Sequence, residues 1–130
     1  MPKNSNISYH EPQRIDSLTE DDFDALPFGA IKLDANGRIL KYNLYESRLA
    51  GRDPSEVIGQ NFFIEVAPCT NVQEFAGLYR KGIAEGKLDT TFPYRFLFPN
   101  RVVDVEITLI LNPDGASAWV FVKESDLAKA

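Results

Sequence analysis

Cysteine is nearly absent from this sequence, in which Cys69 is the only thiol among 130 residues. One cysteine excludes a disulfide within the chain and any zinc site built from several cysteines. Histidine is equally scarce: His10 is the only one, and it lies in a polar N-terminal stretch that makes it a poor candidate for a metal ligand. The sequence therefore predicts neither a disulfide-stapled fold nor a metal centre.

Long hydrophobic runs and an excess of basic residues are also missing. The longest apolar runs, such as Ala118–Val122, are far too short to span a bilayer. A formal net charge of -5 argues against a nucleic-acid or anionic membrane surface, since both need clustered lysine and arginine. The polar stretch from Met1 to Pro12 has no apolar segment of a signal peptide. We expect a cytoplasmic protein with no nucleic-acid and no membrane partner.

The length of 130 residues suits a single domain, which can bury a sizeable core without covalent staples. The hydrophobic share of 44% is that of an ordinary globular protein. We expect residues 1–26 to form an N-terminal cap segment, of which residues 1–13 are flexible, and residues 27–130 to form the core.

Capping residues predict several short helices in the first half of the chain. Ser17 and Glu20 fit a capping box, so a short helix should begin there and end before Pro27. Residues 44–65 are expected to form further helical turns. One of them has a strong start at Asp53-Pro54-Ser55-Glu56, which supplies an N-cap, a proline in the first turn and a glutamate.

One longer helix is predicted over residues 72–85. Asn71 is a capping candidate before it, and Gly86 is suited to the position just after its end. The apolar residues that recur at helical spacing are Val72, Phe75, Ala76, Tyr79 and Ile83.

Alternating apolar and polar residues predict antiparallel strands. Asn36-Gly37 and Asp114-Gly115 supply tight turns, and Pro99-Asn100 is expected at a third turn. Pro93 lies inside a strand pattern, which favours an edge strand or a bulge. The predicted strands are residues 30–33, 38–42, 92–98, 103–111 and 116–123.

This order of elements predicts an α+β fold. A hairpin is followed by short helices, one longer helix and a three-stranded meander, which together make one antiparallel sheet of about five strands. We expect helices on one side of the sheet, an N-terminal helical cap, and a small pocket between the sheet and the short helices.

Several short strings occur in order along the chain, and together they are specific although each alone is weak. They are Phe28-Gly29-Ala30-Ile31, Tyr42-Asn43, Gly51-Arg52-Asp53-Pro54, Val57-Ile58-Gly59, Asn61-Phe62-Phe63, Val66-Ala67-Pro68-Cys69-Thr70 and Trp119-Val120-Phe121-Val122-Lys123. In this combination the sequence resembles the photoactive yellow protein family over about residues 15–123. The resemblance implies a PAS-like fold.

Cys69 has two readings from the residues alone. It can be a buried structural thiol, or a reactive one favoured by its position just before a predicted helix. A catalytic thiol would need a base, and His10 lies in the wrong region to serve. The resemblance implies that Cys69 carries 4-hydroxycinnamic acid (p-coumaric acid), linked as a thioester.

Tyr42 and Glu46 are four residues apart and would share one face of a helical turn. From the residues alone, the plainer interpretation is that Tyr42 is the end of a strand and Glu46 is a solvated helix residue. The resemblance implies that both donate hydrogen bonds to the pigment's phenolate oxygen, with Glu46 protonated. Ala50 stands where the family usually has a threonine that supports Tyr42, so a modest colour shift is expected.

The remaining pocket residues are also implied by the resemblance. Arg52 would cover the pocket, although a surface charge is the plainer reading. Phe98 replaces a common tyrosine, and Asn100 replaces a methionine near the pigment, so thermal recovery is expected to be slower than in methionine-bearing relatives. The other expected contacts are Phe62, Thr70, Tyr94 and Phe96.

The resemblance implies a blue-light photoreceptor and not an enzyme. Trans–cis isomerisation of the pigment, proton transfer from Glu46 and a reversible photocycle would pass a signal to an unknown downstream signalling protein. We expect a monomer or a weak dimer. Two alternatives remain open: a PAS module that binds a small ligand non-covalently or mediates dimerisation, and a thiol enzyme that uses Cys69.

Overall fold

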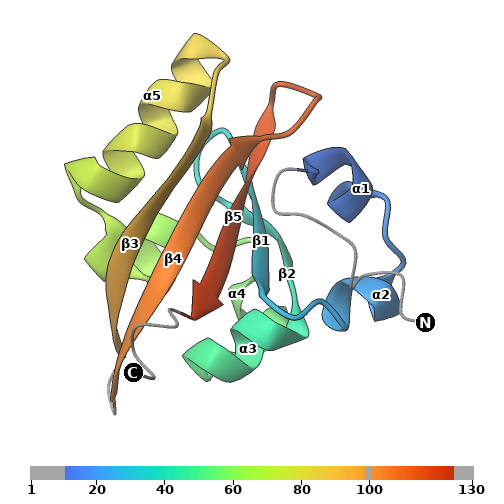
Figure 1. The fold of residues 1–130 in the computed structure, drawn as a ribbon. Helices are drawn as coiled ribbons and strands as arrows, with labels where there is room; N and C mark the ends of the chain where they lie inside the picture. The colour runs from blue at the N-terminus through green and yellow to red at the C-terminus, as the bar shows by residue number, and fades with distance from the viewer. Residues whose placement is uncertain (1–10, 99–100, 125–130) are drawn as a thin grey trace.

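The computed structural model describes residues 11–98 and 101–124, which form one five-stranded antiparallel sheet flanked by helices (Figure 1). The strands lie in the order β2-β1-β5-β4-β3, so the first hairpin forms one edge and the C-terminal meander forms the rest. The predicted α+β layout is confirmed. The elements are α1 (Pro12–Asp16), α2 (Glu20–Asp24), β1 (Gly29–Asp34), β2 (Ile39–Tyr42), α3 (Leu44–Ala50), α4 (Pro54–Val57), the π-helix η2 (Phe62–Val66), the 3₁₀-helix η3 (Pro68–Thr70), the π-helix η4 (Gln73–Gly77), α5 (Leu78–Glu85), β3 (Asp89–Phe98), β4 (Arg101–Leu111) and β5 (Ser117–Glu124).

The two faces of the sheet bury two separate apolar clusters. Val120 and Val122 of β5 point into the larger cluster, which α3, α4, η2, η4 and α5 cover. Trp119 and Phe121, on the opposite face of the same strand, pack into a smaller cluster under α1 and α2. The cap helices therefore lie across the sheet from α5, as Figure 1 shows.

Charged side chains fasten the cap to the first hairpin. Asp16, at the end of α1, pairs with Lys32 at 2.6 Å and with Lys41 at 3.6 Å. Phe23 of α2 packs on Trp119 with 5.8 Å between ring centroids.

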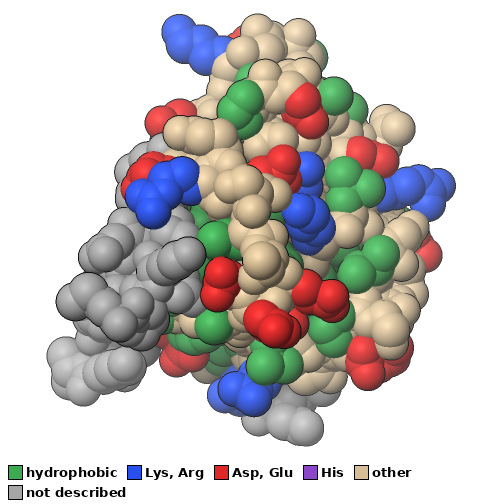
Figure 2. Space-filling view, turned by 90° about the vertical axis from the view of Figure 1, so that its right-hand side faces the viewer, with side chains coloured by type: hydrophobic (Ala, Val, Ile, Leu, Met, Phe, Trp, Pro, Cys, Tyr) green, Lys and Arg blue, Asp and Glu red, His purple; other side chains and the backbone are tan. Residues whose placement is uncertain are grey.

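On the side shown in Figure 2, acidic and basic side chains are interspersed, with no continuous basic tract among the residues it describes.

The first predicted helix start is wrong by two residues. Thr19, not Ser17, is the N-cap of α2, and its hydroxyl accepts a hydrogen bond from the backbone N–H of Asp22 at 3.2 Å. The Ser17 hydroxyl instead donates to the backbone at the end of α1. The stretch expected to be flexible, residues 1–13, is partly helical because α1 covers its end, and residues 1–10 lie outside the described residues.

The longer helix occupies residues 73–85, close to the prediction, but its first turn is a π-helix. The predicted cap at Asn71 is wrong: the N-cap is Val72, without a side-chain hydrogen bond. The Asn71 side chain instead accepts a hydrogen bond from Arg80 of α5 at 3.1 Å, which links the segment before the helix to its later turns. Gly86 ends the helix as predicted, in the left-handed conformation at a φ of 68°.

The strand ends follow the expected turn chemistry. Pro93 lies in β3, which is an edge strand, so its missing N–H breaks no ladder to a further strand. Gly37 supplies the positive φ of 90° in the first hairpin turn. Asp53 caps α4 by accepting from the backbone of Ser55, as predicted. The predicted turn at Pro99-Asn100 lies outside the described residues.

Candidate functional site

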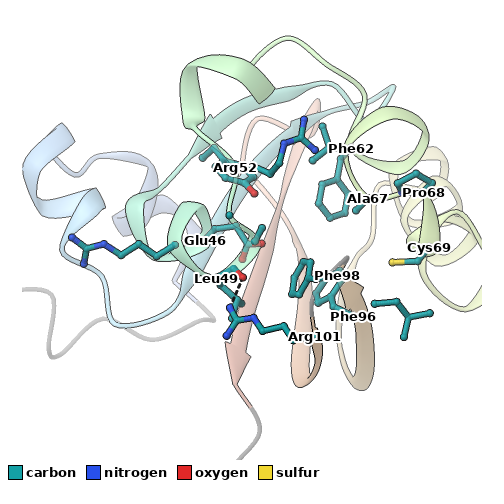
Figure 3. Close-up of a pocket in the computed structure, with 16 residues that line it drawn as sticks. Glu46, Leu49, Arg52, Phe62, Ala67, Pro68, Cys69, Phe96, Phe98 and Arg101 are labelled. Atoms are coloured by element: carbon teal, nitrogen blue, oxygen red, sulfur yellow. Dashed lines mark hydrogen bonds between the residues drawn. The ribbon is translucent and has the colours of Figure 1, made fainter.

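A cavity of about 620 Å³ lies between α3, the turn helices η2 and η3, and the paired ends of β3 and β4. Figure 3 shows Cys69 on one side of it and Glu46 on the other, so segments far apart in the sequence meet around one space. Most of its lining is apolar. The lining residues are Tyr42, Glu46, Arg48, Leu49, Ala50, Gly51, Arg52, Phe62, Val66, Ala67, Pro68, Cys69, Phe96, Leu97, Phe98 and Arg101.

Glu46 is a buried acid with an unsatisfied oxygen. Asn43 caps α3 by accepting from the Glu46 N–H at 3.1 Å, which fixes Glu46 in the first turn facing the sheet. Glu46 is only 3% exposed, and among the residues that the structure describes Oε1 has no hydrogen-bond partner. Burial raises the pKa of the Glu46 carboxyl to about 8. The carboxyl is therefore protonated over most of the neutral range and can act as a hydrogen-bond donor.

Gly29, the first residue of β1, makes room for this acid. A Cβ at position 29 would clash with Glu46 Oε1 and lie 3.2 Å from the Cβ of Val122. We expect Gly29→Ala to lower the free energy of unfolding by about 1–3 kcal/mol, the usual cost of overpacking a core, as measured by urea titration. The same change in a Glu46→Ala background should cost clearly less. Equal costs in the two backgrounds would contradict this packing.

Tyr42 brings a second hydroxyl to the same cavity. It ends β2, pairs with Ile31 of β1, and is 4% exposed. Burial raises the pKa of the Tyr42 hydroxyl far above its usual range; the neighbouring Glu46 carboxyl raises it further, and the Arg52 guanidinium opposes the rise. Tyr42 therefore stays a neutral phenol with a proton to donate.

Cys69 lies in η3, and its sulfur points toward the cavity in Figure 3. The side chain is partly buried. The longer helix does not begin directly after it, because η4 starts only at Gln73. The predicted support for a thiolate from that helix is therefore weaker than the sequence indicated. What the structure gives Cys69 is access to the cavity.

Two of the expected contacts, Thr70 and Tyr94, hold the turn beside the cavity. Thr70 is fully buried, and its hydroxyl donates to the carbonyl of Ala67 at 2.7 Å. The Tyr94 hydroxyl donates to the carbonyl of Cys69. Neither residue lines the cavity. Both hold the turn that carries Cys69, and their contact with a pigment stays a prediction.

The aromatic wall comes from η2 and β3. Phe62 is buried and lines the cavity, and Phe96 stacks on Phe98 with 5.6 Å between centroids and 17° between ring planes. The structure thus brings these three predicted residues together. Asn100 lies outside the described residues, so the expected effect of this residue on recovery stays a prediction.

The segment after α3 forms the edge of the cavity near Arg52. The backbone N–H of Arg52 donates to the carbonyl of Ser47 at 3.1 Å, and the Ser47 hydroxyl donates back to the Arg52 carbonyl at 2.6 Å. Gly51 ends the helix at a φ of 69°. Arg52 is half-buried and lines the cavity beside Ala50. That Arg52 shields a pigment stays a prediction.

Sequence reasoning missed Arg48, Leu49 and Arg101 as cavity residues. Arg101 could have been found, because counting back by two from the inward-facing Val105 and Val103 places position 101 on the same face of β4. Arg48 and Leu49 gave no such signal, since the sequence predicted only short helical turns there.

Within residues 11–98 and 101–124, no group of three or more histidine, cysteine, aspartate or glutamate side chains could hold a metal ion. None of the helices in the same ranges is long and apolar enough to cross a membrane. His10, the one candidate base for a thiol enzyme, lies outside them.

Comparison with known proteins places the fold. The family model described as PAS fold matches residues 6–124. The photoactive yellow protein of Halochromatium salexigens is 44% identical over 107 residues, which cover 82% of this chain and 86% of that protein. That of Rhodobacter capsulatus is 43% identical over 120 residues, covering 92% and 90%. The crystal structure of the photoactive yellow protein domain from the sensor histidine kinase Ppr of Rhodospirillum centenum superposes with a TM-score of 0.85 at 44% identity, covering 87% of this chain and 99% of that one.

Proposed function

This chain belongs to the PAS-fold family and, within it, to the photoactive yellow proteins, and on that basis we propose that it is a blue-light receptor whose pigment is a p-coumaroyl group bound as a thioester to Cys69. One observation carries the proposal. The chain's only thiol and a buried carboxyl with an unpartnered oxygen line the same aromatic cavity.

The residues present fit such a group. A buried phenolate is costly unless short, charge-assisted hydrogen bonds hold it. Tyr42 and a protonated Glu46 are two donors for that oxygen, and within residues 11–98 and 101–124 no partner competes for Glu46 Oε1. Phe62, Phe96 and Phe98 offer flat apolar walls for a conjugated ring.

Attachment needs only Cys69 and an activated acyl donor. The Cys69 sulfur attacks the donor's carbonyl carbon, the carbon–sulfur bond forms as the bond to the leaving group breaks, and the thiol proton leaves with that group. The hydrogen bond from Tyr94 to the Cys69 carbonyl holds the turn while this end is anchored.

When bound, the pigment would supply absorption of blue light and a trans–cis isomerisation of its double bond. Glu46 then gives its proton to the phenolate oxygen and is left as a charged carboxylate. The charge stands in a buried site where no described residue donates to Oε1, which costs several kcal/mol. A domain of ordinary stability has only about 5–15 kcal/mol to lose, so local structure loosens.

The cap is the part placed to respond. Asn43, at the start of the helix that carries the acid, donates through its side-chain amide to the carbonyl of Phe23 at 3.3 Å. The backbone N–H of Leu44 donates to the side chain of Asp24 at 3.0 Å. Movement at the start of α3 is therefore transmitted to α2 through these hydrogen bonds. The cap segment, residues 1–26, would then be released, and it would return to its place in the dark.

Reconstitution tests the proposal. We expect the purified chain, incubated with p-coumaric anhydride, to gain the mass of one p-coumaroyl group, turn yellow, bleach under blue light and recover in the dark. A colourless, unmodified protein would favour the PAS module that binds a ligand non-covalently or mediates dimerisation. Turnover of peroxide or of an acyl donor would favour a thiol enzyme.

Glu46→Gln should shift the absorption maximum of the reconstituted protein to the red. An amide stabilises the localised phenolate charge less than a carboxylic acid does, and excitation spreads that charge along the conjugated chain. Absorption spectra of the two proteins at the same pH check this. A blue shift would mean that Glu46 does not donate to the phenolate.

The output of the receptor is a signal and not a chemical product. The similar domain from Rhodospirillum centenum belongs to a sensor histidine kinase. We infer that this chain likewise acts on a signalling protein, in the cytoplasm, and makes or breaks no bond in a substrate. A monomer or weak dimer stays our prediction for its oligomeric state.

A further inference from the structure

Arg101 ties together two walls of the cavity. It is the first residue of β4, and its Nη2 donates to the carbonyl of Leu49, 52 positions away, at 2.7 Å. Its guanidinium also lies over the ring of Phe98, 6.0 Å from the centroid. Figure 3 shows this hydrogen bond at the side of the cavity away from Arg52.

The acceptor is a group that needs a partner. Leu49 lies in the last turn of α3, where a helix leaves its carbonyls without intrahelical donors. The Ser47 carbonyl of that turn is satisfied by the backbone N–H groups of Gly51 and Arg52. Arg101 supplies the donor for Leu49 from the β3–β4 hairpin, and a cation suits the negative end of a helix.

The two elements that Arg101 joins have different parts in the site. On one side, α3 carries Glu46 and leads into Arg52. On the other, the hairpin carries the stacked pair Phe96 and Phe98. If the bond opens, the end of the helix can move away from the aromatic wall and let water reach the acid.

We propose that Arg101 is a positioning residue, a latch that holds the end of α3 against the β3–β4 hairpin and thereby sets how fast the dark state re-forms after illumination. The part that concerns recovery rests on the proposed function. The part that concerns the closed helix does not, because it can be measured without pigment.

Hydrogen exchange of the pigment-free 130-residue chain tests the latch itself. We expect the amides of α3 to exchange about tenfold faster in Arg101→Ala than in the wild type, the factor for losing one charge-assisted hydrogen bond. Arg95→Ala is the matched control, since Arg95 lies on the same hairpin and is exposed like Arg101, but pairs with Asp104 of β4 and not with α3. Exchange in Arg101→Ala equal to the wild type, or equally fast in Arg95→Ala, would overturn the proposal.

Flash photolysis of the reconstituted proteins tests the consequence. Dark recovery should slow several-fold in Arg101→Ala and return toward the wild-type rate in Arg101→Lys, which keeps a cationic donor. Arg95→Ala should recover like the wild type. Equal rates in Arg101→Ala and the wild type would overturn the part of the proposal that concerns recovery. If no variant takes pigment, the proposed function fails, while the exchange data still decide whether the latch exists.

Discussion

Cys69→Ala is expected to abolish pigment attachment completely. Since this is the only sulfur nucleophile in the chain, no other cysteine can take the acyl group. The fold should survive, because Cys69 is only partly buried and its turn is held by the hydrogen bonds of Thr70 and Tyr94. Intact mass and absorption after treatment with p-coumaric anhydride measure the loss, and a urea titration checks that the variant is folded.

The matched control for Cys69→Ala is wild-type protein whose thiol has been alkylated before the anhydride is added. Both samples should remain colourless. Neither should gain the mass of a p-coumaroyl group relative to the same protein before the anhydride is added. A folded Cys69→Ala protein that turned yellow and bleached reversibly would mean that the cavity holds the pigment without a covalent bond. That result would replace the thioester with the non-covalent alternative.

Much of the fold could be predicted because it depends on local patterns. Alternation in β3 and β4 predicted two strands of the meander, and Gly37 and Gly86 marked a turn and a helix end that require positive φ. The choice of Thr19 over Ser17 as a cap could not be predicted, since either hydroxyl can cap a helix. Tertiary packing decides it, because the register that starts at Thr19 puts Phe23 against Trp119.

The site was less accessible to sequence reasoning. A glutamate in the first turn of a short helix is normally solvated, and residue type alone gives no sign that Glu46 is buried. Its burial depends on Gly29 in the neighbouring strand, a relation that only the three-dimensional structure supplies. Tyr42, Glu46 and Cys69 were identified through family resemblance. Arg101 was not identified, although strand alternation places it on the inward face of β4, and no local pattern predicts its pairing with Leu49, which lies 52 positions away.

Between about pH 5 and pH 8, the pigment-free chain should lose stability as the pH rises. Burial raises the pKa of the Glu46 carboxyl from 4.5 to about 8, so in this range the folded state holds a proton that the unfolded state has released. The contribution of Glu46 to the free energy of unfolding is therefore fully present below its unfolded pKa, and it declines until the pH passes its folded pKa. The total loss is on the order of 5 kcal/mol, because stability falls by about 1.4 kcal/mol for each step of one in pH between the two pKa values.

Other acids act in a different range and in the opposite direction. The backbone N–H of Ala116 lowers the pKa of Asp114, and that of Ser55 lowers the pKa of Asp53. Such groups stabilise the fold above their unfolded pKa and lose that contribution only as the pH falls through their folded pKa. They therefore do not contribute to the change in stability between pH 5 and pH 8 that is expected from Glu46.

Urea unfolding of the wild type and Glu46→Gln across this range isolates the effect of Glu46. The glutamine cannot ionise, so the decline should largely disappear, while the control Glu56→Gln, at an exposed position, should keep it. His10 is present in all three proteins, so its titration cancels in the differences. Parallel curves for the wild type and Glu46→Gln would mean that the acid does not stay protonated in the folded chain.

A pigment phenolate beside Glu46 would raise the pKa of the Glu46 carboxyl further. The loss of stability with rising pH should therefore continue to a higher pH in the reconstituted protein than in the pigment-free chain.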